Sequence, residues 1–372
     1  MRIPLAQPEI LDSDIDAVVR VLRSPYLAMG PALSEFEHAI AAYIGSPHAV
    51  ALNSGTSGLH LAVRCLNLQE GDEVIAPSFA FAAVANVLLQ EHITPVFVDI
   101  DPLTLNITPA AVEAAVGPRT RAVLVVHTFG YPAEIDTIRE ITCRRKLALI
   151  EDACEALGAE VQGKKAGTFG DAAIFAFYPN KQITTGEGGI LVTPDPRIAR
   201  RAKLLRSQAK DDSLDWARQH AEIGYSYRIA DINCALGTAQ LSRIDGILEQ
   251  REKLAASYDA RLRNHPAILP PPSACPYGRI SWFAYVVQLA EKHTRNDRDR
   301  VWQSLLDHGI GAGRYFAPLH NQPVLQGRYR QSGSLAVTES AASRVLALPF
   351  FVGMTERQID EVCSALTALL AS

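Results

Sequence analysis

The sequence predicts an α/β fold in which a large domain with a mostly parallel sheet precedes a smaller α+β domain. From residue 48 to about residue 193, short apolar runs alternate with segments of helical periodicity. Several of these runs are almost continuously apolar, which is typical of strands that helices cover on both faces. Five prolines between residues 266 and 276 then interrupt the pattern. We therefore expect a large domain over residues 1–264 and a small C-terminal domain over residues 265–372.

The composition indicates a globular protein. The chain has 372 residues, of which 48% are hydrophobic, and this is enough for about two domains with substantial cores. The formal net charge is −4 and the arginines are scattered, so we expect no binding to nucleic acid. The N-terminus lacks the pattern of a signal peptide, and no apolar run is long enough to span a bilayer. We expect a soluble, cytoplasmic protein without membrane attachment.

The cysteines and histidines do not indicate a metal site. Six cysteines occur without a C-x-x-C pair and mostly inside apolar patterns, so buried free thiols are the favoured interpretation. No spacing of histidines or carboxylates completes a set of metal ligands. We therefore predict neither disulfides nor a metal.

Two helices are predicted near the N-terminus. Residues 13–23 have apolar side chains at helical spacing, and Ser13 can cap the start of that helix. A second helix is expected over residues 32–43. The loop between them, SPYLAMGP, is either a wall of a substrate site or a plain connection.

The strands of the large domain are predicted from short runs rich in apolar and β-branched residues. These runs are HAVALN (48–53), EVIAP (73–77), TPVFVDI (94–100), RAVLVVH (121–127), LALIED (147–152), AAIFAF (172–177) and GGILVT (188–193). Helical patterns separate the earlier ones, as in parallel sheets built from βαβ units.

The remainder of the chain is predicted to be mostly helical before the prolines and mixed after them. Residues 196–263 are expected to be largely helical and include a long charged stretch from residue 239. Beyond the prolines we expect a strand over residues 282–289 and a helix over residues 298–308. The final helix should begin with a capping box formed by Thr355 and Gln358.

A single lysine follows one of the buried strands. The stretch IFAFYPNKQITTGEGG (174–189) places Lys181 in a turn before a glycine-rich segment, and the chain has only eight lysines in all. An amine that is partly desolvated at the end of a strand can act as a nucleophile toward carbonyl groups. The alternative is a solvated loop lysine, and this stretch alone favours neither hypothesis.

Other strand ends carry groups that suit a ligand. Asn53 to Gly58 lie between a strand and a helix, so Gly55 and Thr56 form either an anion site or a plain helix cap. Asp152 can hold a protonated ring nitrogen, bind a metal or cap the next helix.

Aromatic and imidazole groups follow two further strands. Phe79 and Phe81 can stack on a flat cofactor or belong to the core, and His127 is either a ligand contact or a structural histidine. An anion site, an aromatic face, a carboxylate and an amine together fit one cofactor, pyridoxal phosphate.

The chain resembles the DegT/DnrJ/EryC1/StrS family of pyridoxal-phosphate-dependent sugar aminotransferases nearly from end to end. The segments that carry the resemblance include GPALSEFEHAIAAYIG, ALNSGTSGLHLAV, GDEVIAPSFAFAAVANV, FVDIDPLTLNI, VVHTFGYPAEID, IEDACEALGA, the stretch around Lys181, and GYSYRIADINCALGTAQL. The resemblance implies the fold type I architecture of pyridoxal-phosphate enzymes and a homodimer with active sites at the subunit interface.

The resemblance also implies roles for individual residues. Lys181 would bind the cofactor covalently, Asp152 would pair with its pyridine nitrogen, and Phe81 would stack on its ring. Gly55 and Thr56 would bind its phosphate.

Three positions depart from the common pattern of the family. Ala176 replaces a phosphate-binding serine, and Ser226 replaces an asparagine that reaches the phosphate from the partner subunit. Ser54 or Thr185 are candidates to compensate for these two changes. Glu155 stands where Gln or His commonly lies near the phenolic oxygen of the cofactor, and a carboxylate would be repelled there unless it is protonated or turned away.

The activity implied by the resemblance is transfer of an amino group from an amino acid, glutamate, to a nucleotide-linked keto-sugar. Candidate substrate-binding residues are Tyr26, Met29, Arg228, Arg314 and His320. Two alternatives remain open at this point. One is a sugar dehydratase of the same family, against which Lys181 argues because those relatives typically have histidine there. The other is a regulatory or accessory protein that binds the cofactor without turnover.

Overall fold

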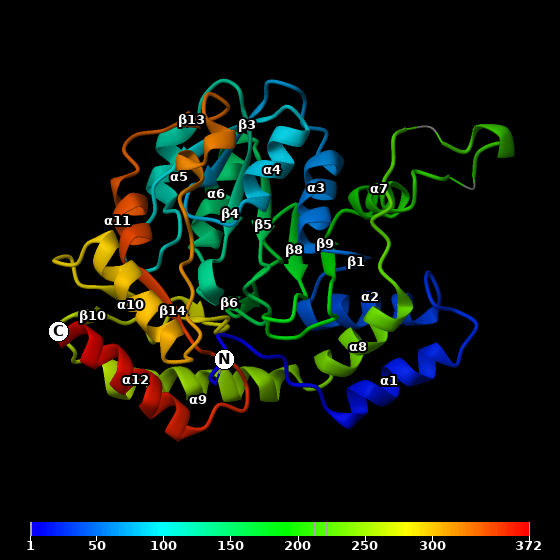
Figure 1. The fold of residues 1–372 in the computed structure, drawn as a ribbon. Helices are drawn as coiled ribbons and strands as arrows, with labels where there is room; N and C mark the ends of the chain where they lie inside the picture. The colour runs from blue at the N-terminus through cyan, green and yellow to red at the C-terminus, as the bar shows by residue number, and fades with distance from the viewer. Residues whose placement is uncertain (1, 212, 221, 372) are drawn as a thin grey trace.

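The computed structural model describes residues 2–211, 213–220 and 222–371. Its centre is an eight-stranded sheet in the order β1-β9-β8-β5-β4-β2-β3-β13 (Figure 1). These strands are β1 (His48–Leu52), β2 (Glu73–Pro77), β3 (Thr94–Val98), β4 (Thr120–Val126), β5 (Ala148–Asp152), β8 (Ala172–Ala176), β9 (Gly189–Thr193) and β13 (Arg330–Gln331). Every strand expected in the large domain is present, and the predicted α/β class is confirmed.

Strand direction in this sheet has one exception. Strand β9 pairs antiparallel with both β8 and β1, whereas the pairs among β8, β5, β4, β2, β3 and β13 are parallel. Two successive reversals bring β1 back to the common direction. The carboxyl ends of β1, β2, β4, β5 and β8 therefore lie along the same edge of the sheet.

Alternate residues of each strand enter cores on opposite faces of the sheet, as the two-residue period of a strand requires. On one face, Val50 and Leu52 pack with α3 (Gly55–Cys65), α4 (Ala83–Gln90) and α7 (Pro196–Arg206). On the other face, Ala49 and Ala51 pack with α2 and α8. Helices α2 (Pro31–Ile44), α8 (Asp231–Leu241), α5 (Pro109–Ala115) and α6 (Ile135–Arg145) cover that second face.

A second core lies in the C-terminal part. A three-stranded sheet in the order β10-β12-β14 is formed by β10 (Ile268–Leu269), β12 (Tyr285–Leu289) and β14 (Val345–Leu348). Its surrounding helices are α9 (Ile244–Leu262), α10 (Arg295–Asp307), α11 (Ala336–Arg344) and α12 (Glu356–Ala371). In Figure 1, α9 and α12 run along the lower side of the molecule.

Two short strands tie this C-terminal part to the rest of the protein. Strand β11 (Gly278–Arg279) pairs with β6 (Glu160–Val161), which also pairs with β7 (Lys164–Lys165), and β13 extends the large sheet beyond β3. Because elements after residue 264 join sheets of the first part, the domain boundary between residues 264 and 265 stays a prediction.

Several predicted boundaries were wrong in detail. Helix α1 (Asp12–Leu22) does not use Ser13 as its cap; instead the Asp14 carboxylate accepts a hydrogen bond of 2.9 Å from the Leu11 N–H. The charged stretch from residue 239 to 263 is divided between α8 and α9, which break at residues 242–243. The capping box of Thr355 and Gln358 is confirmed, with 2.9 Å from the Thr355 N–H to Gln358 Oε1.

We expected the segment between α7 and α8 to be helical, but its described residues form no α-helix. Among its described residues the structure has only the short 3-10 helix η2 (Trp216–Arg218), and Figure 1 shows the segment projecting from the upper right of the molecule. The predicted strand at 282–289 begins later, at Tyr285. Within the described ranges, no helix is both long and apolar enough to cross a lipid bilayer.

Candidate active site at the carboxyl edge of the large sheet

The N-terminus of α3 lies against the ends of two neighbouring strands. A Cβ atom added at Gly55 would be 2.8 Å from the Ala176 Cβ atom at the end of β8 and 3.0 Å from the Cys154 Sγ atom just beyond β5. The small Gly55 thus lets the first turn of α3 approach the strands that lead to Asp152 and Lys181. Segments that are far apart in the sequence come together here.

Lys181 lies in a tight turn after β8. Its N–H donates to the Tyr178 carbonyl oxygen at 2.9 Å, and its Nζ atom lies 3.4 Å from Glu155 Oε1. The Nζ atom is also 4.0 Å from the centroid of the Phe283 ring, a cation–π geometry. The side chain is only 13% exposed, so the hypothesis of a solvated loop lysine was wrong.

Glu155 is the closest acidic partner of this amine among the described contacts. Its Oε2 atom accepts a hydrogen bond of 2.9 Å from the Phe129 N–H, while Oε1 faces Lys181. Burial raises the pKa of the Glu155 carboxyl above its ordinary value, although Lys181 and the Phe129 N–H act in the opposite direction. The carboxyl is therefore poised between its neutral and ionised forms more closely than a surface glutamate.

Asp152 ends β5 beside this pair. Its Oδ1 atom accepts a hydrogen bond of 3.1 Å from the Cys154 N–H, and the residue is 7% exposed. Strand β5 is flanked by β4 and β8, so the carboxylate has a fixed position at the sheet edge. No group of three or more His, Cys, Asp or Glu side chains among the described residues is arranged to hold a metal ion.

The first turn of α3 combines a helix cap with free donors. The Ser57 N–H donates to Ser54 Oγ at 3.1 Å, so the Ser54 hydroxyl serves as the cap. The N–H groups of Gly55 and Thr56 have no partner inside the helix, because the first turn lacks preceding carbonyl groups. The Thr185 hydroxyl donates to the Glu187 carbonyl oxygen at 2.7 Å. Ser54 and Thr185 thus both have internal partners.

The two candidate aromatic residues differ in their environment. Phe79 is fully buried and makes edge-to-face contacts with Phe129 and Phe316. Phe81 is 64% exposed and lines a cleft of about 350 Å³. Phe79 is therefore a core residue, whereas Phe81 is free to pack against a ligand.

His127 has a structural position. Its Nδ1 atom accepts a hydrogen bond of 3.1 Å from the Ala133 N–H, so the proton lies on Nε2, which faces Glu151 Oε2 at 3.1 Å. Both side chains are fully buried. Glu151 also accepts hydrogen bonds from the N–H groups of Gly167 and Gly170.

The residues at this edge fit the expected cofactor. A Cβ at Gly55 would fill the space between α3 and the strands, so the glycine preserves a close approach to the helix N-terminus. This N-terminus suits a phosphate, Asp152 suits a protonated ring nitrogen, and the Lys181 amine suits an aldehyde. Pyridoxal phosphate contains all three groups.

Four predicted contact residues lie on two adjacent segments. Ala28, between Tyr26 and Met29, forms a β-bridge with Ala230. The side chains of Tyr26 and Met29 are 56% and 46% exposed. The structure thus brings this loop beside the segment that contains Ser226 and Arg228.

Ser226 and Arg228 contact each other. Arg228 Nη2 donates to Ser226 Oγ at 2.9 Å, and the Asn53 amide donates to the Ser226 carbonyl oxygen at 3.4 Å. Both Ser226 and Arg228 are exposed. Their side chains remain accessible from outside this chain, next to the residues that precede α3.

Arg314 and His320 have different surroundings. The Arg314 guanidinium lies 3.8 Å from the Trp302 ring centroid and 3.1 Å from Asp299 Oδ1, at the edge of a cleft of about 440 Å³. His320 is buried, with Nδ1 2.6 Å from Ser78 Oγ and Nε2 3.2 Å from Glu339 Oε1. A substrate role for His320 stays a prediction, since both ring nitrogens have protein partners.

Sequence reasoning missed two residues that surround Lys181. Phe283 supplies the ring beneath Nζ. Arg251, on α9, is 4% exposed and donates to the carbonyl oxygens of Trp282 and Phe283 at 3.2 Å and of Lys181 at 3.4 Å. The charged pattern of α9 reads as a solvated helix, so no local signal separates Arg251 from its neighbours.

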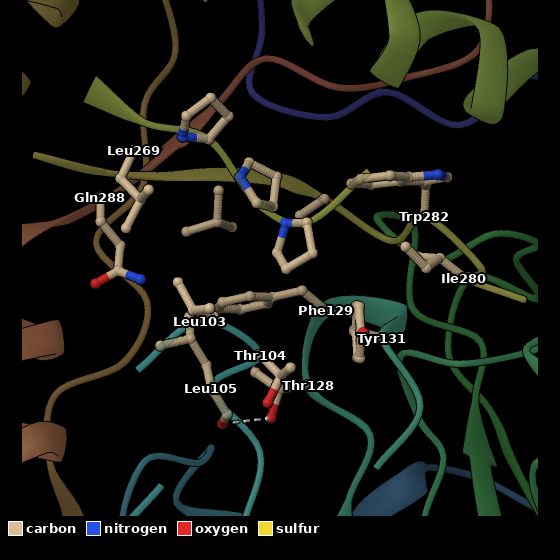
Figure 2. Close-up of a pocket in the computed structure, with 15 residues that line it drawn as sticks. Leu103, Thr104, Leu105, Thr128, Phe129, Tyr131, Leu269, Ile280, Trp282 and Gln288 are labelled. Atoms are coloured by element: carbon tan, nitrogen blue, oxygen red, sulfur yellow. Dashed lines mark hydrogen bonds between the residues drawn. The ribbon is translucent and has the colours of Figure 1, made fainter. Parts of the chain in front are cut away.

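A separate apolar pocket lies near Phe129. Figure 2 shows Leu103, Phe129 and Trp282 around it, and three consecutive prolines (270–272) form one wall. Its lining contains no lysine or arginine. This pocket therefore offers no side-chain cation to a phosphate or carboxylate.

Comparison with known proteins agrees with this geometry. The model of the DegT/DnrJ/EryC1/StrS aminotransferase family matches residues 8–367. The chain is 38% identical to the GDP-perosamine synthase of Caulobacter vibrioides over 99% of this chain and 98% of that protein.

Two solved structures are also similar. Helicobacter pylori PseC, an aminotransferase involved in the biosynthesis of pseudoaminic acid, has a TM-score of 0.95 at 28% identity over the full length of both chains. S. venezuelae DesV, solved in complex with a ketimine intermediate, has a TM-score of 0.88 at 34% identity and covers 96% of this chain and 94% of that one. With the family match over nearly the whole chain, this protein belongs to the DegT/DnrJ/EryC1/StrS aminotransferase family.

Proposed function

We propose that this protein is a pyridoxal-phosphate-dependent aminotransferase that converts a nucleotide-linked keto-sugar to an amino sugar, with glutamate as the amino donor. The observation that carries the proposal is the position of Lys181, a largely buried amine 3.4 Å from Glu155, at the sheet edge that also holds Asp152 and the N-terminus of α3. The names of relatives support a sugar substrate, since they refer to GDP-perosamine and to pseudoaminic acid.

Each group at the sheet edge has a role in this proposal. Lys181 holds the cofactor through Nζ, Asp152 holds its ring nitrogen, and Phe81 packs on its ring. The N–H groups of Gly55 and Thr56 bind its phosphate. When bound, the cofactor supplies an electron sink for the charge that develops at the α-carbon of the donor. The Lys181 Nζ atom then takes and returns the proton as general base and acid.

The cleft beside Arg314 supports a place for the anionic part of the substrate. Arg295, Arg298 and Arg314 share a single carboxylate, Asp299, with nitrogen–oxygen distances of 3.8, 2.8 and 3.1 Å. Burial lowers the pKa of the Arg298 guanidinium; Asp299 raises that pKa in part, and the charges of Arg314 and Arg295 lower it again. Glu339 also lines the cleft, so three arginines face two carboxylates, and the remaining positive charge favours a phosphate-bearing ligand.

The same cleft reaches the neighbourhood of the cofactor residues. Phe316 lines it and also lines the neighbouring cleft beside Phe81. The Phe316 ring stacks on Phe129 with centroids 5.4 Å apart, and the Phe129 N–H bonds to Glu155. A ligand in these two clefts would therefore extend from the arginines toward the cofactor, on whose ring Phe81 packs in this proposal.

The proposed enzyme is a homodimer with its active sites at the interface. Large apolar side chains are exposed on the N-terminal elements and on the projecting segment, namely Ile15, Leu22, Tyr26, Leu27, Met29, Trp216 and Ile223. In the proposed dimer, association would bury these side chains. The exposed Ser226 and Arg228 would then face the cofactor of the other subunit.

The cofactor and the amino donor can be tested by absorption spectroscopy. We expect the purified protein to gain the visible band of bound pyridoxal phosphate and to lose it on addition of glutamate, as the cofactor takes up the amino group. Lys181→Ala should abolish the band, because no amine remains to bind the aldehyde. A band that survives this substitution would identify another lysine as the site. A band that glutamate and other amino acids leave unchanged would contradict transamination.

The phosphate position can be tested at Gly55. Gly55→Ala should weaken binding of pyridoxal phosphate roughly 10- to 100-fold, which corresponds to about 1–3 kcal/mol for a side chain forced into a packed space. The added Cβ would meet Ala176 and Cys154. Gly246→Ala, where a Cβ meets nothing within 4 Å, is the matched control and should leave the affinity unchanged. Equal affinities for the two variants would show that the phosphate does not bind at the N-terminus of α3.

The anionic cleft can be tested by steady-state kinetics with a nucleotide-linked keto-sugar. Arg314→Ala should raise KM for the sugar about tenfold without a similar change in KM for glutamate, because one charge-assisted hydrogen bond is lost. Arg300→Ala, on helix α10 but outside the cleft lining, serves as the control. An unchanged KM for the Arg314 variant would exclude this cleft as the phosphate site.

The oligomeric state can be measured by light scattering after size-exclusion chromatography. We expect twice the mass of one chain. Replacing the exposed Trp216 and Ile223 by serine should shift the protein toward monomers, because less apolar surface is buried on association. A wild-type protein that elutes as a monomer at micromolar concentration would contradict the interface.

A further inference from the structure

Lys181 and Glu155 form a pair in which both side chains are largely buried. The exposed fractions of the two side chains are 13% and 11%, and their charged atoms lie 3.4 Å apart. In such an environment an ammonium and a carboxylate both lose hydration, whereas an amine and a carboxylic acid lose little. Burial therefore destabilises the ion pair relative to the neutral pair and brings the free energies of the two forms closer together.

Glu155 cannot easily turn away from the lysine. The Phe129 N–H holds Oε2 at 2.9 Å, and the Gln182 amide donates to the Glu155 carbonyl oxygen at 2.7 Å and to Ser281 Oγ at 3.0 Å. Gly130 has a φ of 89° and packs so closely on Ser281 that a Cβ there would lie 1.7 Å from its carbonyl oxygen. Two segments of the chain thus fix the backbone on both sides of the carboxylate.

Few other ionisable groups influence this carboxyl. Asp152 raises the pKa of Glu155 by its negative charge, and Lys181 lowers it. Cys154 and Tyr315 also face Glu155, but burial raises the pKa of each, so both stay neutral near pH 7. The exchange of a proton within the site is therefore between Glu155 and Lys181.

We propose that Glu155 is the proton acceptor of Lys181, which converts the lysine to its reactive form. The bond between Nζ and one hydrogen breaks, the electron pair stays on nitrogen, and the proton forms an O–H bond on Oε1. The ammonium and the carboxylate become an amine and a carboxylic acid, so charge is conserved and no co-reactant is needed. The proton returns to Nζ by the reverse step. This rests on the proposed function only in taking Lys181 as the amine that reacts with the cofactor.

The proposal also accounts for a carboxyl group at this position. An ionised carboxylate would repel a phenolate oxygen placed beside it. After transfer, Glu155 is a neutral acid, and its O–H group can donate a hydrogen bond to such an oxygen. Glutamine at this position donates a hydrogen bond but cannot accept the proton.

The decisive measurement is the rate at which cofactor-free protein binds pyridoxal phosphate covalently, followed by visible absorbance from mildly acidic to mildly alkaline pH. Glu155→Gln keeps the size of the side chain and an oxygen for the Phe129 N–H. We expect it to slow binding roughly 100-fold at neutral pH, the usual scale of a lost general base. In the variant the rate should keep rising into the alkaline range, because the ammonium must then lose its proton to solvent instead of to a neighbouring carboxylate.

The sign of this effect separates the proposal from its alternative. If Glu155 only holds Lys181 as an ammonium by charge attraction, Glu155→Gln will free the amine and binding will be as fast as in the wild type or faster, which would overturn the proposal. Glu187→Gln changes an exposed glutamate in the loop that contains Lys181 and should leave the rate unchanged. Glu155→Asp retains a carboxylate and should restore part of the rate.

A second measurement needs neither cofactor nor turnover. Infrared difference spectra of the cofactor-free wild type and Glu155→Gln report the protonated carboxyl of this residue as pH is varied. We expect its midpoint above the ordinary glutamate value, and higher still in Lys181→Met, because Lys181 lowers the pKa of Glu155. A midpoint at the ordinary glutamate value in both the wild type and Lys181→Met would overturn the proposal. Failure of glutamate to convert the bound cofactor would instead contradict the proposed function and leave these results interpretable.

Discussion

The common direction of the strands is the constraint on which the site depends. Because β1, β2, β4, β5 and β8 run the same way, the groups that follow them meet at one edge of the sheet. The exception, β9, is equally important. An antiparallel neighbour allows a short return from β8, whereas a parallel one needs a long crossover. Lys181 lies in this return, whose ends are joined by hydrogen bonds from the Phe177 N–H to Gly188 and from the Thr185 N–H to Phe177.

The polar groups of the site are held by backbone contacts as much as by each other. Arg251 is buried and bonds to carbonyl oxygens on both sides of the lysine, from the segment at Phe283 and from Lys181 itself. Burial lowers its pKa to about 10, so the guanidinium remains charged at neutral pH. The bond to the Lys181 carbonyl oxygen links the return loop after β8 to α9, and the bond to Phe283 continues this link to the segment before β12. The position of Nζ thus depends on elements of both parts of the protein.

The departures from the common family pattern have a local physical meaning. Ala176 and Gly55 face each other at the end of β8, and their small size sets the distance between α3 and the sheet. The Ser226 hydroxyl already accepts a hydrogen bond from Arg228, so that pair presents a combined hydroxyl and guanidinium to its surroundings. The hydroxyls of Ser54 and Thr185, in contrast, are engaged in a helix cap and a loop. In the proposed site, the backbone N–H groups at the start of α3 remain to bind the cofactor phosphate.

The sequence alone determined seven strands of the large sheet, the α/β class and the location of Lys181, Asp152 and Gly55 after strands, because apolar runs and the residues that follow them are local patterns. It did not predict β13, a strand of two residues without an apolar pattern. It misplaced helix limits such as the break at residues 242–243, where charge and helical periodicity continue across the interruption. Only the tertiary structure decided that Phe283, Arg251 and Phe129 surround the lysine and its carboxyl partner. These contacts join residues dozens of positions apart, and their energies depend on burial that no single segment of the sequence specifies.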